Sequence, residues 1–317
     1  MENKKIIAVV GATGAQGGGL ARAILSDPHS EFAVRALTRD PNSPAAQELA
    51  KLGAEVVAAD VDNVDSLRKA FDGAYGAFCV TFFWNHFSPE QEFQQASNMA
   101  HAAKDAGVEH VVWSTLEDTR KWVPLDSDQM PTLMGKYKVP HFDAKGEADA
   151  LFKELGVPTT FFLTSFYWDN FVHFGMGPKV NDDGTLVLNL PMGDQPLAGI
   201  SADDIGRAAY GVFKAGKSMI GKTVGVAGGH LTGQEMAEKM SAALGRPVTY
   251  NAVPFDVYRS LGFPGAEDLG NMFQYYHDFN DDFSSRRSLE GARALNPELK
   301  SFDDWLAIHK DQLVPAS

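Results

Sequence analysis

The feature that most constrains this chain is a glycine-rich loop set between an apolar strand and a helical pattern. Residues 6–10 are apolar, Gly11, Gly14 and Gly17 follow, and a helical pattern continues to residue 25. One glycine permits a tight turn, another lets backbone N–H groups approach a pyrophosphate, and a third lets the helix pack closely on the strand. Gly11 and Gly14 are three residues apart, whereas the first two glycines of the G-x-G-x-x-G motif are two apart, so the glycines alone match weakly. The strand before the loop and the helix after it are the reason that we predict a dinucleotide site.

Short apolar strands alternate with helical patterns over the first half of the chain. Strands are expected at residues 6–10, 32–37, 55–59, 77–80, 110–113 and 159–163, and helices at 17–25, 45–52, 64–71, 89–106 and 142–155. The strands lack polar alternation, as expected when helices cover both faces of a parallel sheet. The predicted fold class is therefore α/β, with a Rossmann-type doubly wound parallel sheet.

The second half is less regular. It contains loops, short strands and helices that begin at capping sequences, among them Ser201 and Thr232. We expect a dinucleotide-binding domain over residues 1–164, with return elements near 200–228, and a smaller α+β lobe over 165–317. No flexible linker separates the halves, so the lobe is expected to pack over the nucleotide domain and form a cleft.

Composition excludes several classes of function. A net charge of −13 argues against nucleic-acid binding, which depends on clustered Lys and Arg. No stretch approaches the roughly 20 apolar residues of a membrane span, and the amino terminus lacks a secretory signal, so a cytoplasmic location is expected, with nuclear entry left open. Cys79 is the only cysteine, which excludes an intrachain disulfide and a thiolate-rich metal site, and its apolar neighbours predict a buried thiol. No metal site is predicted.

The end of the second expected strand selects between NADP and NAD. Arg39 stands where an acidic residue would bind the ribose of NAD, and its guanidinium suits a 2′-phosphate. Asp40 keeps NAD open, because a shift of one residue would present its carboxylate instead. At the end of the third strand, Asp60 and the Val61 backbone are predicted to contact adenine, with a helix-cap role for Asp60 as the alternative.

The usual proton donor of short-chain dehydrogenases is absent. Those enzymes carry Tyr-x-x-x-Lys on a helix, and here His141 occupies the tyrosine position and Lys145 the lysine position. His141 is either a general acid or a structural residue, and Lys145, Tyr137 or a water are the other candidate proton donors. Lys145 is predicted to contact the nicotinamide ribose.

These features resemble the NmrA-like family of atypical short-chain dehydrogenases. The resembling stretches are residues 11–18, 38–39, 53–57, 141–147, 156–158 and 261–273, the last reading Leu-Gly-Phe-Pro-Gly-Ala-Glu-Asp-Leu-Gly-Asn-Met-Phe. The resemblance implies NADP(H) as the cofactor. Together with Gly17 of the loop, it implies cofactor contacts from Gly11, Ala12, Thr13, Gly14, Ala15, Gln16, Arg39, Asp60, Val61, Thr81, Phe82, Phe83, Lys145, Tyr167 and Asn170.

Two departures from the family pattern stand out. Residues 42–44 replace an expected basic residue, which would weaken 2′-phosphate binding, and residues 121–138 are longer than in a relative. That longer segment is either a lid or partner-binding loop or a disordered connection.

Two functions remain. The resemblance and the missing tyrosine favour a sensor of the NADPH/NADP⁺ ratio that regulates protein partners. The alternative is an NADPH-dependent reductase of a small carbonyl, imine or enone using Lys145, supported by an expected aromatic cleft over residues 161–174. A partner protein or a small apolar substrate is expected in the interlobe cleft, and a homodimer is possible. Whether the chain is an enzyme is left open.

Overall fold

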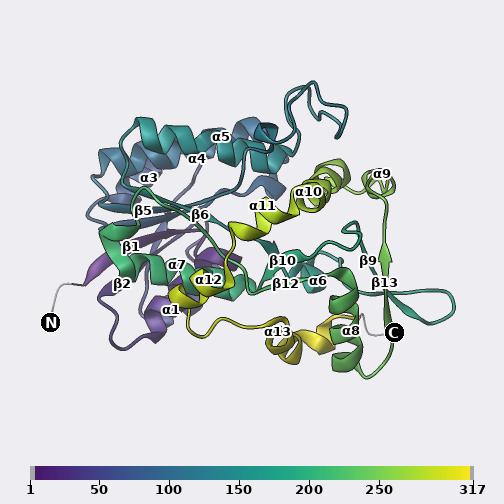
Figure 1. Cartoon of the computed structure of the whole chain (residues 1–317). Helices are drawn as coiled ribbons and strands as arrows, with labels where there is room; N and C mark the ends of the chain where they lie inside the picture. Colours follow the sequence, from purple (N-terminus) through teal and green to yellow (C-terminus); the bar gives the residue numbers. More distant parts are fainter. Residues whose placement is uncertain (1–3, 315–317) are drawn as a thin grey trace.

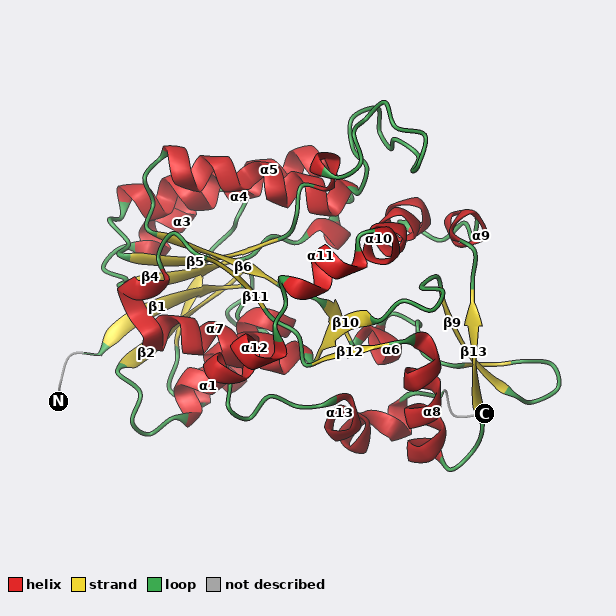
Figure 2. Ribbon diagram, viewed as in Figure 1, coloured by secondary structure: helices red, strands yellow, loops and turns green. Residues whose placement is uncertain are grey.

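Seven parallel strands form the central sheet of the computed structural model, which describes residues 4–314 (Figures 1 and 2). Their spatial order is β11-β6-β5-β4-β1-β2-β3, so the order reverses between β1 and β4. Ligand crevices open at such a reversal, beyond the carboxyl ends of the strands. The strands are β1 (Lys5–Val10), β2 (Phe32–Thr38), β3 (Glu55–Ala58), β4 (Gly76–Cys79), β5 (His110–Thr115), β6 (Thr159–Leu163) and β11 (Thr223–Gly225). The predicted doubly wound α/β fold is confirmed.

Helices cover both faces of this sheet. In Figure 1, α3, α4 and α5 lie on one face and α1, α7 and α12 on the other. The helices of this part are α1 (Ala15–Ser26), α2 (Pro44–Lys51), α3 (Val64–Phe71), α4 (Pro89–Asp105), α5 (Pro140–Glu154), α7 (Ala202–Ala215) and α12 (Leu289–Leu295), with short 3₁₀ turns η1 (Phe83–Asn85), η2 (Thr119–Lys121) and η3 (Gly216–Met219). Because both faces are covered, strands such as β4, β5 and β6 are buried at every residue.

A second group of elements lies beyond the carboxyl ends of the central strands (Figure 1). Two three-stranded sheets and several helices pack there around a second apolar core. The elements are β7 (Phe166–Tyr167), β8 (Lys179–Val180), β9 (Leu186–Leu190), β10 (Leu197–Ile200), β12 (Gly229–Leu231), β13 (Val248–Ala252), α6 (Asn170–His173), α8 (Gly233–Leu244), α9 (Phe255–Arg259), α10 (Ala266–Asp278), α11 (Asn280–Ser285), α13 (Phe302–His309) and η4 (Lys310–Gln312).

The chain crosses between the two cores more than once. β11, α7 and α12 come from the second half of the sequence but pack into the core of the central sheet. A buried ion pair also joins the two parts, with Arg287 Nη1 at 2.7 Å from Glu117 Oε1 and Nη2 at 3.0 Å from Oε2. Arg287 Nε donates to the Thr164 carbonyl at 2.7 Å, so the guanidinium is satisfied on several sides.

Helix α1 begins earlier than its glycines suggested. The helix was expected from Gly17, but it begins at Ala15, with Gly14 as its N-cap. The later glycines serve packing: a Cβ on Gly19 would lie 2.8 Å from the Asp203 carbonyl oxygen of α7, and one on Gly206 would lie 2.1 Å from the Leu20 nitrogen. Glycine on both helices therefore permits a close crossing of α1 and α7.

The long segment at residues 121–138 is an ordered part of the fold, which overturns the disordered alternative. The buried Asp143 carboxylate accepts hydrogen bonds from the backbone N–H groups of Thr119 at 2.7 Å and Lys138 at 2.8 Å. Asn271 of α10 donates to the Lys138 carbonyl at 2.6 Å, which ties the end of the segment to the second core.

The expected aromatic cleft over residues 161–174 is wrong. Phe162, Phe166, Trp168 and Phe171 are all buried in the two cores, because their strands and the short helix α6 turn these rings inward. Tyr167 is partly buried and Phe174 is 67% exposed, but neither lines the cavities described below, so most rings of this run supply core packing rather than a cleft wall.

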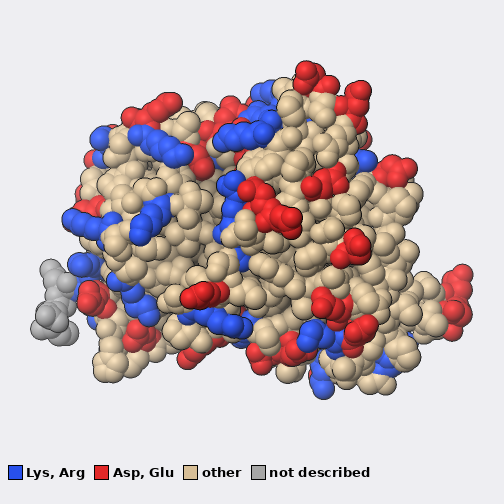
Figure 3. All heavy atoms as spheres, in the orientation of Figure 1, with Lys and Arg blue, Asp and Glu red and all other residues tan. Residues whose placement is uncertain are grey.

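No helix within residues 4–314 is long and apolar enough to cross a membrane. The same residues bring together no group of three or more His, Cys, Asp or Glu side chains that could hold a metal ion. On the face drawn in Figure 3, basic and acidic side chains are interspersed.

The close crossing of α1 and α7 yields a stability prediction. Gly206→Ala should lower the free energy of unfolding by about 1–3 kcal/mol, because the methyl group overlaps backbone that cannot move away alone. Gly291→Ala in α12 is the control, since its methyl would meet only ordinary contacts at 3.6 Å, and it should be neutral or stabilising by about 0.5–1 kcal/mol. Urea unfolding measures both, and equal effects would contradict the crossing.

Candidate functional site

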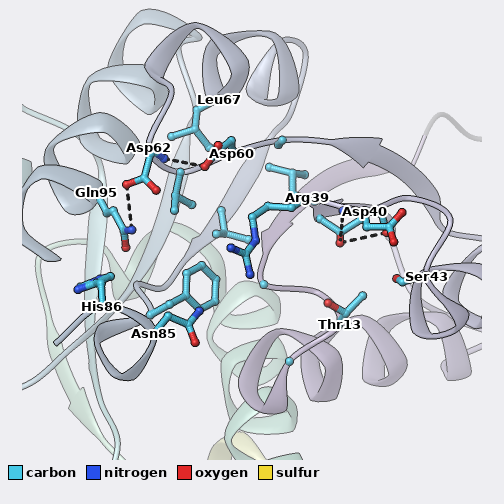
Figure 4. A pocket seen from close by; sticks show the side chains of 18 of the residues that line it. Thr13, Arg39, Asp40, Ser43, Asp60, Asp62, Leu67, Asn85, His86 and Gln95 are labelled. Carbon is cyan, nitrogen blue, oxygen red and sulfur yellow. Dashed lines mark hydrogen bonds between the residues drawn. The ribbon is translucent and has the colours of Figure 1, made fainter. Parts of the chain in front are cut away.

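A cavity of about 430 Å³ opens at the carboxyl edge of the sheet, where the strand order reverses. Figure 4 shows it between the glycine loop, the end of β2 and the start of α4. Seven of the residues predicted to bind the cofactor line it, and they come from the loops that follow β1, β2, β3 and β4. These are Gly11, Thr13, Gly14, Arg39, Asp60, Val61 and Phe82.

The glycine loop makes the floor of the cavity. Gly11 has φ +64°, and a Cβ there would come within 3.0 Å of the Phe82 ring, so only glycine fits without strain. A Cβ on Gly17 would lie 2.5 Å from the Gly11 carbonyl oxygen, which places the helix directly against the loop. Gly14 supplies no side-chain cap to α1, so N–H groups of the first helical turn are available to an anion.

Arg39 and Asp40 follow β2 but have different surroundings. The Arg39 guanidinium points into the middle of the cavity (Figure 4) and forms no hydrogen bond or ion pair with any other residue within 4–314. The Asp40 carboxylate instead accepts a hydrogen bond from the Asn42 N–H at 2.9 Å and so closes the turn after β2. Ser43 caps α2 from the same turn and also lines the cavity.

The opposite wall is built from the residues after β3. Asp60 accepts from the Asp62 N–H at 3.0 Å, and the cap of α3 is Asn63, so the alternative that Asp60 caps a helix is wrong. Asp62 accepts from Gln95 Nε2 at 3.0 Å (Figure 4), which gives this wall a fixed set of polar groups.

A buried cluster lies behind this cavity, at the end of β4. Lys145 Nζ lies 3.0 Å from Glu92 Oε1 and donates to the Thr81 hydroxyl, which itself donates to Glu92. His86 Nε2 lies 3.5 Å from the other Glu92 oxygen. Burial by itself would raise the pKa of Glu92, but the Lys145 ammonium, the nearby His86 ring and the Thr81 hydroxyl outweigh it and lower the pKa. Glu92 is therefore a buried carboxylate that holds Lys145 in place.

His141 is engaged elsewhere. Its Nδ1 lies 2.7 Å from Asp268 Oδ1, its backbone N–H donates to the same carboxylate, and its ring lies 4.8 Å from the Trp84 ring centre. Tyr137 is also buried, and its hydroxyl donates to Glu90 at 3.4 Å. His141 and Lys145 share one face of α5, as the sequence predicted, yet each faces its own carboxylate.

Several of the remaining predicted contacts lie around the start of α1. Gln16 donates to the Tyr167 hydroxyl and accepts from Ser114 Oγ at 2.8 Å. Burial raises the pKa of Tyr167. Asn170 begins α6. Nine of the predicted contact residues do not line the 430 Å³ cavity. They are Ala12, Ala15, Gln16, Gly17, Thr81, Phe83, Lys145, Tyr167 and Asn170. Their cofactor contacts stay predictions.

Comparison with known proteins decides the family. The profile of the NmrA-like family matches residues 3–306. The chain belongs to the NmrA-like family. It is 33% identical over 300 residues to the NmrA-like family domain-containing oxidoreductase FrzB of Cladobotryum sp, which covers 85% of this chain and 83% of that relative.

Solved structures agree with this membership. NmrA, a negative transcriptional regulator, superimposes on this NmrA-like protein with a TM-score of 0.80 at 25% identity and 98% coverage of both chains. That regulator has been solved in complex with NADP and with NAD. A triphenylmethane reductase of Citrobacter sp. has the same fold, with a TM-score of 0.72 at 20% identity over 98% of this chain and 99% of its own.

Sequence reasoning missed several residues of this site. Nothing in the sequence distinguishes the buried Glu92 from the exposed Glu90, because acidic residues are common in the first turn of any helix. Asn85 and His86 line the cavity and follow the carboxyl end of β4, so their position beyond a parallel strand was a usable signal. No sequence pattern indicates that Asp62 and Gln95 belong to the site, because they meet only when α4 packs against the loop after β3.

The Glu92–Lys145 pair yields a double-mutant prediction. Glu92→Gln and Lys145→Met should each lower the free energy of unfolding by about 3–5 kcal/mol, because each leaves a buried charge without its partner. The double variant should lose less than the sum of the two, with a coupling above about 1 kcal/mol in urea unfolding.

The exposed Arg68–Asp105 pair, at 2.7 Å, is the control for this cycle. Arg68→Met and Asp105→Asn should couple by less than about 1 kcal/mol, because water screens both charges. A Glu92–Lys145 coupling no larger than this control would contradict the buried ion pair.

Proposed function

We propose that this NmrA-like protein binds NADP(H) in the cavity between the glycine loop and α4. Two observations support the fit: N–H groups of α1 are open to a pyrophosphate, and the Arg39 guanidinium reaches the cavity without a carboxylate partner. The related regulator NmrA has been solved with NADP and with NAD, so both dinucleotides have a precedent in the family. When bound, the nicotinamide supplies hydride acceptor or donor chemistry.

We further propose that the bound dinucleotide acts as a signal that regulates a protein partner. The single observation that carries this is the engagement of the two residues at the Tyr-x-x-x-Lys positions: Lys145 is paired with buried Glu92, and His141 with buried Asp268. Neither is free to pass a proton without breaking a buried ion pair or hydrogen bond, and such a break is costly. The structural similarity to a negative transcriptional regulator points the same way.

Cofactor choice tests the first proposal. Arg39→Ala should weaken NADPH binding by about 10- to 100-fold, because a charged hydrogen bond contributes about 1.5–3 kcal/mol, and should leave NADH binding nearly unchanged. Isothermal titration of both dinucleotides measures this. Arg68→Ala, an exposed arginine of α3 outside the cavity, is the matched control and should bind as the native protein does.

A preference for NAD would give a different result in the same titrations. Equal native affinities for NADPH and NADH, with binding lost in Asp40→Ala, would mean that the Asp40 carboxylate contacts the ribose. That result would replace NADP with NAD as the preferred cofactor.

The regulatory role predicts a response to the redox state of the dinucleotide. Saturation with NADPH and with NADP⁺ should give different amide hydrogen-exchange rates at residues 82–87, which form part of the cavity wall. Hydrogen exchange of the full-length protein under native conditions, followed by digestion and mass spectrometry of the peptides, measures these rates. Identical exchange in the two complexes across residues 4–314 would contradict a redox sensor.

A reductase of a small carbonyl, imine or enone is the second candidate, favoured by a 33% identical relative named as an oxidoreductase. In that case Lys145, oriented by Glu92, would supply the proton. Turnover of NADPH with such compounds that disappears in Lys145→Ala, but persists in the Lys153→Ala control on the exposed side of α5, would favour the reductase over the pure sensor.

A further inference from the structure

A second cavity, which we name the lateral pocket, lies on the far side of the η1 segment from the nucleotide cavity. Its volume is about 560 Å³, within the range of about 300–1,000 Å³ that small-molecule sites occupy. Residues 83–87, 133–140 and 259–268 contribute to its wall, so both halves of the chain build it.

Residues 82–87 form a wall shared by the two cavities. Phe82, Asn85 and His86 line the nucleotide cavity, whereas Phe83 and Phe87 line the lateral pocket, and no described residue lines both. Phe87 has φ +54°, a strained conformation for a residue with a side chain, and its N–H donates to the Phe83 carbonyl at 2.7 Å. Because the wall is a single turn, a shift on one side moves side chains on the other.

The interior of the lateral pocket is aromatic and partly open to solvent. Phe83 is buried, while Phe87, Met134 and Phe263 are 38%, 61% and 36% exposed. Met134 also has a positive φ, of +49°. Exposed rings and a thioether gathered in one concave site mark a place where an apolar ligand gains contact area.

Charge narrows the class of ligand. Glu267 lines the pocket, and its carboxylate forms no ion pair or hydrogen bond with another residue of the described chain. Asp268 beside it is already engaged with His141. The Arg259 guanidinium is turned to α10, where it donates to Asn271 at 3.2 Å and Gln274 at 2.8 Å. Both of those bonds come from Nη1, so Arg259 still presents its positive charge to the lining. The lining therefore carries two carboxylates against one guanidinium, and Glu267 is its carboxylate without a partner in the described chain.

We propose that the lateral pocket binds a planar aromatic small molecule that carries an N–H or O–H donor, and that this binding is coupled to dinucleotide occupancy through residues 82–87. The donor bonds Glu267, and the rings stack among Phe83, Phe87 and Phe263. The coupling rests on the proposed function, whereas the ligand site stands without it.

A matched pair of fluorescent probes tests the site in the full chain without dinucleotide. N-phenyl-1-naphthylamine is neutral and has an N–H donor, and 1-anilinonaphthalene-8-sulfonate adds a negative charge to the same rings. The neutral probe should bind about tenfold or more tightly, because the sulfonate meets Glu267, and Glu267→Gln should shrink that preference. Equal or tighter binding of the sulfonate would overturn the assignment of ligand class.

Substitutions in the pocket test the location. Phe263→Asp should weaken the neutral probe by about tenfold or more, because it removes a ring that the probe covers. Phe174→Asp, at a ring that is 67% exposed outside the pocket, is the matched control and should change nothing. If Phe263→Asp does not fold, as judged by thermal unfolding, Met134→Asp takes its place. Equal losses in pocket and control variants would overturn the site.

Coupling is tested by repeating the titration with saturating NADPH and with saturating NADP⁺. The dissociation constant of the neutral probe should change by about fivefold or more with at least one dinucleotide. An unchanged constant with bound dinucleotide would overturn the coupling and leave the site. Failure of the proposed function is a separate result, because the protein would then bind no dinucleotide in titrations without the probe. That result would also overturn the coupling, but not the probe site.

Discussion

The close approach of helix α1 to strand β1 is the constraint on which the rest of this structure depends. A side chain on Gly17 would meet the Gly11 carbonyl, so the helix lies against the loop only because that position has no Cβ. The same approach places Gly14, the N-cap of this helix, in the lining of the nucleotide cavity. On its other side, glycines of α1 and α7 let these helices cross closely, which brings a helix from the second half of the chain onto the central sheet.

Buried charge organises the region behind that cavity. Lys145 and Thr81 both contact Oε1 of Glu92, Arg287 and Glu117 join the two cores, and Asp143 accepts hydrogen bonds from backbone N–H groups of the segment before α5. Each carboxylate is buried and each is paired or multiply hydrogen-bonded, as burial of charge requires. Groups that the dehydrogenase pattern would assign to proton transfer are thereby tied into the architecture, and this is the basis of the regulatory role that we propose.

The turn after β4 connects these features. It contributes to the nucleotide cavity with one set of side chains and to the lateral pocket with another, and its Trp84 ring packs against His141 and close to Gly265 at the start of α10. A strained backbone at Phe87 is the kind of local feature that persists only when surrounding contacts hold it. Occupancy of the nucleotide cavity would act directly on those contacts.

The sequence by itself determined the fold class, the glycine loop and the position of Arg39, because these follow from local rules: apolar strands, helical periodicity and the absence of a Cβ. It did not determine the partners of His141 and Lys145, the inward turn of the aromatic run at 161–174 or the burial of Glu92. Those outcomes depend on Asp268 from α10 and Glu92 from α4 meeting α5 in space, and on which side of each strand faces a core. Long-range packing sets both, and no local pattern encodes it.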